Sequence, residues 1–262
     1  MKLKRSIALM AVLALVLVAC GDDGGESTGD FDTITDGTLT VCTDAPYPPM
    51  EMEDPDNPGE YTGFDIELMR SIATNLAMEL AVVNVGFDPI TSGLAMESGE
   101  CDIAAASITI TAERAENIAF TDGYFSGDQS LLVLADSGFG SLEDLSGQSI
   151  AVQTGTTGEI YAQENAPSDT ELVSFENPGD LFLALEADQV QGVLQDLVPN
   201  GDYAYNNDNA VIVETYETDE EYGFAAKLEG TEDLIAAVNE QIQALRDDGT
   251  YDDLFNEFFP QG

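Results

Sequence analysis

The sequence predicts an α/β protein made of two units, each with a parallel-rich sheet covered by helices. Two observations lead to this class. Short apolar runs typical of buried strands alternate with longer segments whose apolar residues recur at a helical period. This alternation occurs twice, on either side of the segment FSGD at 125–128. With 262 residues, 44% of them hydrophobic, the chain is long enough for one or two domains with a real core.

The first unit begins at Leu39. We expect strands at 39–43, 80–85 and 101–105, an extended piece at 61–64, and helices at 65–78 and 88–99. Pro89 in the first turn and Gly99 at the end bound the second of these helices. After the last strand, Thr111 is expected to cap a helix that holds Glu113 and Arg114.

The second unit repeats this layout. We expect strands at 130–134, 149–152, 171–175, 190–194 and 211–213, and helices after Ser141, from Glu159, at 178–187 and at 197–205. A strand at 222–227 is expected to return to the first unit, followed by helices at 231–245 and 251–259. The apolar residues of these last helices are read as core: Ile242, Leu245, Phe255, Phe258 and Phe259.

Residues 1–20 have the pattern of an export signal. Lys2, Lys4 and Arg5 precede an apolar run at 7–19 that is too short to span a bilayer. The segment Leu17-Val18-Ala19-Cys20 resembles a bacterial lipobox, which implies cleavage before Cys20 and lipidation of its thiol. The alternative is plain secretion, with Cys20 a chance residue. Residues 21–30 contain no apolar residue and are expected to form a flexible tether.

Cys42 and Cys101 lie in two of the predicted strands of the first unit. In an exported protein such a pair permits a disulfide, provided that the two strands are neighbours in one sheet. The alternative is two separate buried thiols, and we favour the bridge.

The composition excludes several classes of function. Seven Lys+Arg stand against fifty-one Asp+Glu, so the net charge is −44, and nucleic acid and anionic lipid are poor partners for such a surface. The sequence has no histidine, which excludes Ser-His-Asp catalysis and histidine-ligated zinc. We expect no metal and no cofactor. The loop at 54–60 superficially resembles a calcium loop, but Pro58 takes a ligand position and Asp65 stands where a glutamate is needed, so an exposed turn is expected.

Arg114 is the first candidate for a binding residue. Without the leader, the cations are Arg70, Arg114, Lys227 and Arg246, and Arg114 follows a Ser/Thr cluster at 107–111. A guanidinium can hold a carboxylate through two parallel hydrogen bonds. The alternative is an ordinary surface arginine at the start of a helix.

The other candidates each have a structural alternative. Residues 155–158 (GTTG) precede a helix, so they form either an anion-binding turn or a plain glycine turn. Asp196 follows a strand and either caps a helix or holds an ammonium group. Tyr47 and Phe87 either pack in the core or flank a slot for a ligand. Together with Asp44, these residues follow strands, where ligands gather in α/β sheets, so the two units are expected to face each other across a cleft.

These segments together resemble the bacterial extracellular solute-binding proteins of family 3, the polar amino-acid receptors of ABC importers. The resemblance covers residues 39–259 and rests on the segments TDAPYPP (43–49), GFDIEL (63–68), SITITAER (107–114), FTDGYF (120–125), QTGTT (153–157), LQD (194–196) and DDGTYD (247–252). It implies a type II periplasmic-binding-protein fold of two lobes joined by two connecting strands. The first lobe would hold residues 31–127 and 218–262, and the second 128–217.

The resemblance also implies roles for the site residues. Arg114 would bind the α-carboxylate of an amino acid, with the backbone N–H groups of Thr109 and Thr157. Asp196, the Thr109 hydroxyl and the Ser107 carbonyl would hold the α-ammonium group. Tyr47 and Phe87 would flank the ligand side chain and Asp44 would face its end. The chain has Ala104-Ala105-Ala106 where the family often has Gly or Ser before the motif serine, which puts a side-chain contact from that segment in doubt.

The implied protein is a monomeric, lipid-anchored receptor outside the cell membrane, not an enzyme, that captures a free L-amino acid and delivers it to a membrane permease and its ATPase. Asp44 favours a basic or neutral polar side chain over an acidic one. The alternative is a dehydratase of cyclohexadienyl acids on the same fold, in which Glu53, Asp44 and Asp196 would supply acid or base.

The excess of carboxylates leads to a first prediction. Repulsion among them is screened within a few ångströms at high salt, so we expect the protein to be adapted to a saline environment. Its melting temperature, measured by calorimetry, should rise between low salt and about 2–3 M salt. An unchanged melting temperature would contradict this adaptation.

Overall fold

The computed structural model describes residues 31–259. The predicted export signal at 1–20, the lipidation site Cys20 and the tether at 21–30 lie outside the described residues. Within 31–259, no helix is both long and apolar enough to cross a membrane.

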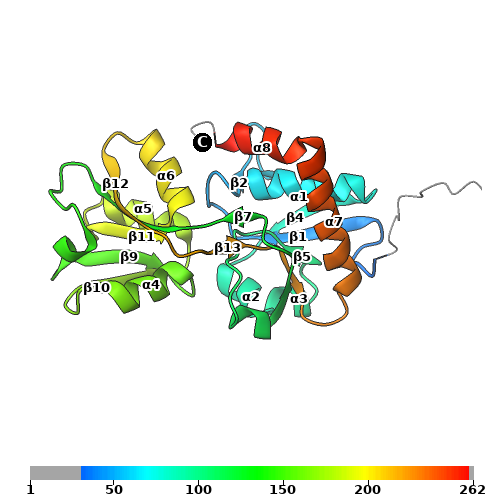
Figure 1. The fold of residues 1–262 in the computed structure, drawn as a ribbon, viewed down its shortest axis with the longest axis horizontal. Helices are drawn as coiled ribbons and strands as arrows, with labels where there is room; N and C mark the ends of the chain where they lie inside the picture. The colour runs from blue at the N-terminus through cyan, green and yellow to red at the C-terminus, as the bar shows by residue number, and fades with distance from the viewer. Residues whose placement is uncertain (1–30, 260–262) are drawn as a thin grey trace, which may run out of the picture.

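The first lobe is built on a five-stranded sheet (Figure 1). Its strand order is β4 (Glu79–Asn84), β1 (Thr38–Thr43), β5 (Ile103–Ala104), β14 (Ala225–Lys227) and β6 (Ile118–Phe120). The first three strands are parallel, and β14 runs antiparallel to both of its neighbours. One face packs against α1 (Phe64–Asn75), α7 (Glu232–Asp248) and α8 (Thr250–Phe258), and the other against α2 (Phe87–Thr91) and α3 (Leu94–Glu97).

The second lobe has the same arrangement of strand directions. Its order is β10 (Glu171–Phe175), β9 (Ser149–Gln153), β11 (Gly192–Asp196), β8 (Gln129–Leu134) and β12 (Ala210–Tyr216). The first three strands are parallel, and β8 is antiparallel to both of its neighbours. One face packs against α4 (Thr157–Asn165), and the other against α5 (Pro178–Glu186) and α6 (Leu197–Asn206). The predicted two-lobed α/β class is confirmed, with each sheet mixed rather than wholly parallel.

Two short strands join the lobes. β7 (Phe125–Ser126) leaves the first lobe and pairs antiparallel with β13 (Glu221–Tyr222), which returns to it (Figure 1). The two connections between the lobes pack closely against each other, because a Cβ on Gly127 would lie 2.5 Å from the Tyr222 ring. We propose the division predicted from the sequence, at 127/128 and 217/218, because the strands of each sheet fall on one side of these boundaries.

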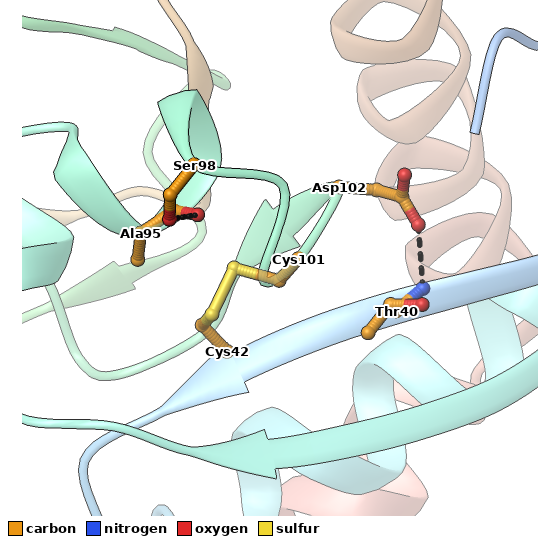
Figure 2. Close-up of a disulfide and its surroundings, with 6 residues drawn as sticks. All are labelled: Thr40, Cys42, Ala95, Ser98, Cys101 and Asp102. Atoms are coloured by element: carbon orange, nitrogen blue, oxygen red, sulfur yellow. Dashed lines mark hydrogen bonds between the residues drawn. A yellow bond between two sulfur atoms is a disulfide. The ribbon is translucent and has the colours of Figure 1, made fainter. Parts of the chain in front are cut away.

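The predicted disulfide is confirmed. Cys42 on β1 is bonded to Cys101, with 5.5 Å between their Cα atoms (Figure 2). Cys101 lies two residues before β5, which pairs with β1. The neighbouring Asp102 accepts a hydrogen bond from the Thr40 N–H at 2.8 Å, so the same loop is also tied to β1 through its backbone.

Four predicted elements are wrong in detail. The helix expected after Ser141 is a 3-10 turn, η2 (Leu142–Leu145), and the Ser141 side chain does not cap it. The single helix at 88–99 is two short helices, α2 and α3, because Gly93 takes a φ of +79° and a Cβ there would lie 2.8 Å from the Asn117 carbonyl oxygen. The strand at 222–227 is two strands, β13 and β14, in different sheets. The helix expected at Arg114 is a 3-10 turn, η1 (Arg114–Glu116), although the Thr111 hydroxyl does accept from the Arg114 N–H at 3.1 Å.

The predicted core residues at the end of the chain divide into two groups. Ile242 and Leu245 on α7 are buried. The phenylalanines of the last helix are only partly buried and pack onto the edge of the same cluster: Phe255, Phe258 and Phe259. The loop at 54–60 is largely exposed, and its Asp54 carboxylate accepts from the Asp56 N–H and the Asn57 side chain. Among residues 31–259, no acidic or cysteine cluster has the size needed to hold a metal ion.

Candidate functional site

A small cavity lies between the two lobes. Its free volume is about 20 Å³, roughly the space that one water molecule needs, because the side chains that line it nearly fill it. All eight residues singled out in the sequence line it: Asp44, Tyr47, Phe87, Ser107, Thr109, Arg114, Thr157 and Asp196. Four further residues line it, of which only Thr156 belongs to a candidate segment, the turn at 155–158: Glu51, Ala106, Gln153 and Thr156. The structure thus brings the predicted residues together, while their role in binding stays a prediction.

Arg114 differs from the other cations of residues 31–259 because it is buried, with 8% of its surface exposed. Its Nη1 donates to the Thr109 carbonyl at 2.8 Å and its Nη2 to the Gly155 carbonyl at 3.1 Å, which lies in the second lobe. The guanidinium also lies 5.0 Å from the centre of the Phe87 ring, within the range of a cation–π contact. Burial lowers the pKa of Arg114, and the nearby carboxylates Asp196 and Glu220 oppose this shift. The group remains a cation.

Asp196 ends β11 and precedes α6, but its side chain does not cap that helix. Its carboxylate instead accepts three hydrogen bonds, from the Tyr47 hydroxyl at 2.8 Å, the Tyr222 hydroxyl at 2.5 Å and the Gln129 amide at 2.6 Å. Burial raises the pKa of Asp196, and these three donors and Arg114 counteract the shift. The donors come from both lobes and from the connecting strand β13, so Asp196 lies where the two lobes and their connection meet.

Tyr47 and Phe87 reach the cavity from the first lobe. Tyr47 lies in the loop after β1, where its N–H bonds the Glu51 carbonyl at 2.7 Å. Its hydroxyl extends across the cavity to Asp196. Phe87 begins α2 and lies against the Arg114 guanidinium. Tyr47 therefore contacts the expected ammonium partner, and Phe87 the expected carboxylate partner.

Asp44 and Glu51 place two further carboxylates in the cavity. Asp44 follows β1 and accepts a hydrogen bond from Gln153 of the second lobe at 2.7 Å. Burial raises the pKa of Asp44 to about 6, despite the Gln153 bond, and the negative charge of Glu176 adds to the shift. Glu51 is almost fully buried, and its pKa is raised well above the usual range by burial and by the neighbouring Asp65 and Asp44. Glu51 carried no strand-end signal in the sequence, because it reaches the cavity from within the loop.

Ser107 owes its position to a buried aspartate. It has a φ of +49°, an unusual conformation for a residue with a side chain. Its N–H donates to Asp65 at 3.0 Å and its hydroxyl to Glu51 at 3.2 Å. Asp65 also accepts from the Tyr124 hydroxyl at 2.6 and 2.7 Å, which gives Tyr124 a role that the sequence did not suggest. Burial raises the pKa of Asp65 to about 7, while the Tyr124 and Ser107 bonds favour its charged form.

The segment 155–158 forms the beginning of α4. The Thr156 hydroxyl caps the helix by accepting from the Glu159 N–H at 3.1 Å. Glu159 in turn accepts from the Gly155 N–H at 2.8 Å. Thr157 is left with its side chain toward the first lobe, 3.4 Å from the Thr109 hydroxyl. The turn is thus a helix cap that also brings Thr157 to the cavity.

Glu220 lies just behind this pair of threonines. It precedes β13 in the second connection between the lobes. Its Oε2 accepts from the Thr157 hydroxyl at 2.9 Å, the Gln129 amide at 3.0 Å and the Thr109 hydroxyl at 3.3 Å. Burial, and then the negative charge of Asp196, raise the pKa of Glu220. Neither Glu220 nor Gln129 belongs to the strand-end residues or the family segments that the sequence indicated.

Comparison with known proteins identifies the family. A model of the bacterial extracellular solute-binding proteins, family 3, matches residues 39–261. The chain belongs to this family. Among curated relatives of this solute-binding protein, the glutamine-binding protein GlnH of an ABC transporter from Bacillus subtilis is 30% identical over 279 residues, which cover 100% of this chain and 98% of the relative. The arginine-binding extracellular protein ArtP of the same organism is 27% identical, with 97% and 96% covered.

Solved structures agree with this family. The solute-binding protein resembles a mutant of the arginine-binding protein ArgBP from T. maritima, with a TM-score of 0.79 and 33% identity over 86% of this chain and 96% of that one. It also resembles an ancestral arginine-binding protein bound to glutamine, with a TM-score of 0.78 and 32% identity over 86% and 99% of the two chains. These neighbours confirm the fold of the solute-binding protein as well as its family.

The raised pKa of Asp44 predicts how stability depends on pH. The folded value of about 6 lies above the ordinary 3.8, so folding favours the protonated carboxyl. This contribution is complete below about pH 4 and is lost as the pH rises through 6. Asp44→Asn should therefore stabilise the protein at pH 8, by up to about 3 kcal/mol, and lose this advantage near pH 4.

Urea unfolding at both pH values measures this difference. Asp56→Asn is the matched control, because it removes the same charge from an exposed turn. If Asp44→Asn and Asp56→Asn changed the free energy of unfolding equally at pH 8, the interpretation of Asp44 would be wrong.

Proposed function

We propose that this solute-binding protein is an exported receptor that captures a free L-amino acid between its lobes and delivers it to the permease and ATPase of an ABC importer. The observation that supports this most directly is the single cavity in which a buried arginine and a buried aspartate face each other from different lobes. The relatives named above are a glutamine-binding and an arginine-binding protein.

In this proposal the two ends of the amino acid bind on different sides of the cleft. Arg114 exchanges its bonds to the Thr109 and Gly155 carbonyls for two bonds to the ligand carboxylate, which also accepts from the backbone N–H groups of Thr109 and Thr157. The ammonium group binds Asp196, the Thr109 hydroxyl and the Ser107 carbonyl. A ligand held this way has partners on both lobes only when they are closed, and that difference in affinity drives closure.

The charges of the cavity favour a basic side chain. Burial raises the pKa of Glu51 well above the usual range and favours its neutral form, but the carboxyl groups of Asp44 and Asp196 still outnumber the single guanidinium of Arg114. A neutral amino acid adds no net charge, whereas a cationic one offsets part of this excess at the end near Asp44 and Gln153. We therefore rank arginine, lysine and ornithine first, neutral polar amino acids second, and glutamate and aspartate last.

The setting of the receptor is part of the same proposal. The leader at 1–20 would direct export, lipidated Cys20 would hold the protein at the outer face of the cell membrane, and 21–30 would tether it. A monomer is sufficient, because both halves of the site come from one chain. The acidic composition suits a saline medium and offers no basic patch for nucleic acid.

A second candidate rests on one neighbour. The chain is 34% identical, with a TM-score of 0.78, to the ancestral amino acid-binding protein AncCDT-1, described as a precursor of cyclohexadienyl dehydratase. Asp44 and Glu51, with raised pKa values, are carboxyl groups able to exchange protons in the cavity. Glu53, which the sequence suggested for this role, is exposed on β2 (Met52–Glu53) and does not line the cavity. Binding is favoured, because both ends of an amino acid find partners.

Incubation with prephenate or arogenate separates the two candidates. The receptor proposal predicts no turnover above the spontaneous rate. Chromatography of the products measures this turnover. Turnover that disappears in an Asp44→Asn variant would overturn it.

Substitution of Arg114 gives the central test. Removing a buried guanidinium deletes two charge-assisted hydrogen bonds worth roughly 1.5–3 kcal/mol each, so Arg114→Ala should weaken every amino acid at least about a hundredfold. The measurement is a thermal-shift screen of the twenty amino acids with ornithine and cystine, followed by calorimetry.

Arg70→Ala is the control, because Arg70 is a partly exposed cation paired with Glu67 at 3.0 Å. It should bind like the wild type. An Arg114→Ala variant that folds and binds with wild-type affinity would exclude the proposed site.

A further inference from the structure

Glu220 contacts two of the residues that are expected to bind the ligand, one from each lobe. Its Oε2 lies 3.3 Å from the Thr109 hydroxyl on the first lobe and 2.9 Å from the Thr157 hydroxyl on the second. Gln129, at the start of β8, donates from the same nitrogen to Glu220 at 3.0 Å and to Asp196 at 2.6 Å. The carboxylates of Glu220 and Asp196 are therefore bridged by one amide.

The protons of this cluster can be assigned from its acceptors. A hydroxyl carries one proton, and a carboxylate is the strongest acceptor within reach of either threonine. The Thr157 hydroxyl donates to Glu220 at 2.9 Å. The Thr109 hydroxyl has Glu220 at 3.3 Å and the Thr157 hydroxyl at 3.4 Å as acceptors. With Glu220 as the acceptor, the proton of Thr109 points toward a carboxylate that does not line the cavity, and the oxygen lone pairs of Thr109 stay free to accept from a ligand.

An ammonium group requires acceptors, not donors. We propose that Glu220 is a positioning residue of the binding site, which fixes the Thr109 hydroxyl as an acceptor for the α-ammonium group of the bound amino acid. The inference rests on the proposed amino-acid function and adds a residue that does not line the cavity itself.

The position of Glu220 in the chain gives this role a second consequence. It lies in the connection that carries β13, whose Tyr222 hydroxyl bonds Asp196. The same connection thus contacts both groups expected at the ammonium end, the Thr109 hydroxyl through Glu220 and the Asp196 carboxylate through Tyr222. The Ile110 N–H donates to the Glu221 carbonyl at 2.8 Å, so Thr109 and Glu220 are held near each other within the first lobe, and the second lobe adds the Thr157 hydroxyl.

The experiment is a double-mutant cycle on L-arginine binding, measured by calorimetry. L-glutamine replaces it if the wild type binds only the neutral amino acid. Glu220→Gln keeps the size of the side chain and removes its charge, and should weaken binding about tenfold. Thr109→Val removes the hydroxyl, and in that background Glu220→Gln should change the affinity less than about threefold, because the group through which it acts is gone.

The matched control is Glu221→Gln, the same change at the next residue, whose side chain is exposed. It should bind like the wild type. A tenfold loss that persists in the Thr109→Val background would overturn the inference, as would unchanged or tighter binding by Glu220→Gln. Tighter binding would identify Glu220 as a competitor of the ligand carboxylate.

The two proposals fail in different ways. A folded wild-type protein that binds neither L-arginine nor L-glutamine would contradict the proposed function, and the role of Glu220 would be rejected with it. A wild-type protein that binds one of them, with no coupling between Glu220 and Thr109, would leave the receptor function intact and reject only the positioning role.

Discussion

A carboxylate taken out of water is destabilising unless hydrogen-bond donors reach it, and this requirement organises the centre of the molecule. Asp196 is satisfied by donors from both lobes and a connecting strand, and Asp65 by Tyr124 and the Ser107 backbone. None of these donors is close in sequence to the group that it serves. The bonds of Asp65 fix the inside of the first lobe, whereas the three donors of Asp196 can reach it only if the two lobes and the connection between them take one relative position, so Asp196 helps to specify the closed arrangement.

Arg114 is the one buried cation among residues 31–259, and it lies among these buried acids. Among the described cations, Arg70 and Lys227 pair with Glu67 and Glu97 at the surface, where ion pairs contribute little. Arg114 bonds carbonyl oxygens in both lobes instead, and its charge remains available to a carboxylate that enters the cavity. Arg114 is one of only seven cations in the sequence, and it lies in the cavity proposed for the ligand. The excess of acids around it disfavours competing anions.

The sequence predicted which residues meet at the cavity better than it predicted the bounds of the elements around it. Arg114, Asp196 and Asp44 were found because polar residues at strand ends collect at one edge of a parallel sheet, and because their segments match a known family. Glu51 and Glu220 were missed because they reach the centre from a loop and a connection, where no periodicity applies. The break at Gly93 was missed because it depends on contact with the Asn117 carbonyl, which is distant in sequence. Local pattern gives residue type and approximate position, whereas the partner of a buried group depends on the tertiary fold.

The connection between the lobes is chemically part of the site. Tyr222 lies on β13, pairs with β7 through its backbone and bonds Asp196 through its hydroxyl. Burial and the charge of Asp196 raise the pKa of Tyr222 well above the usual range, so its proton stays in place to donate. Any rotation of the lobes that moves β13 relative to β11 must therefore alter the donors around Asp196. In the proposed mechanism this contact allows a change at the ammonium end of the ligand to alter the balance between open and closed lobes, with no further relay between them.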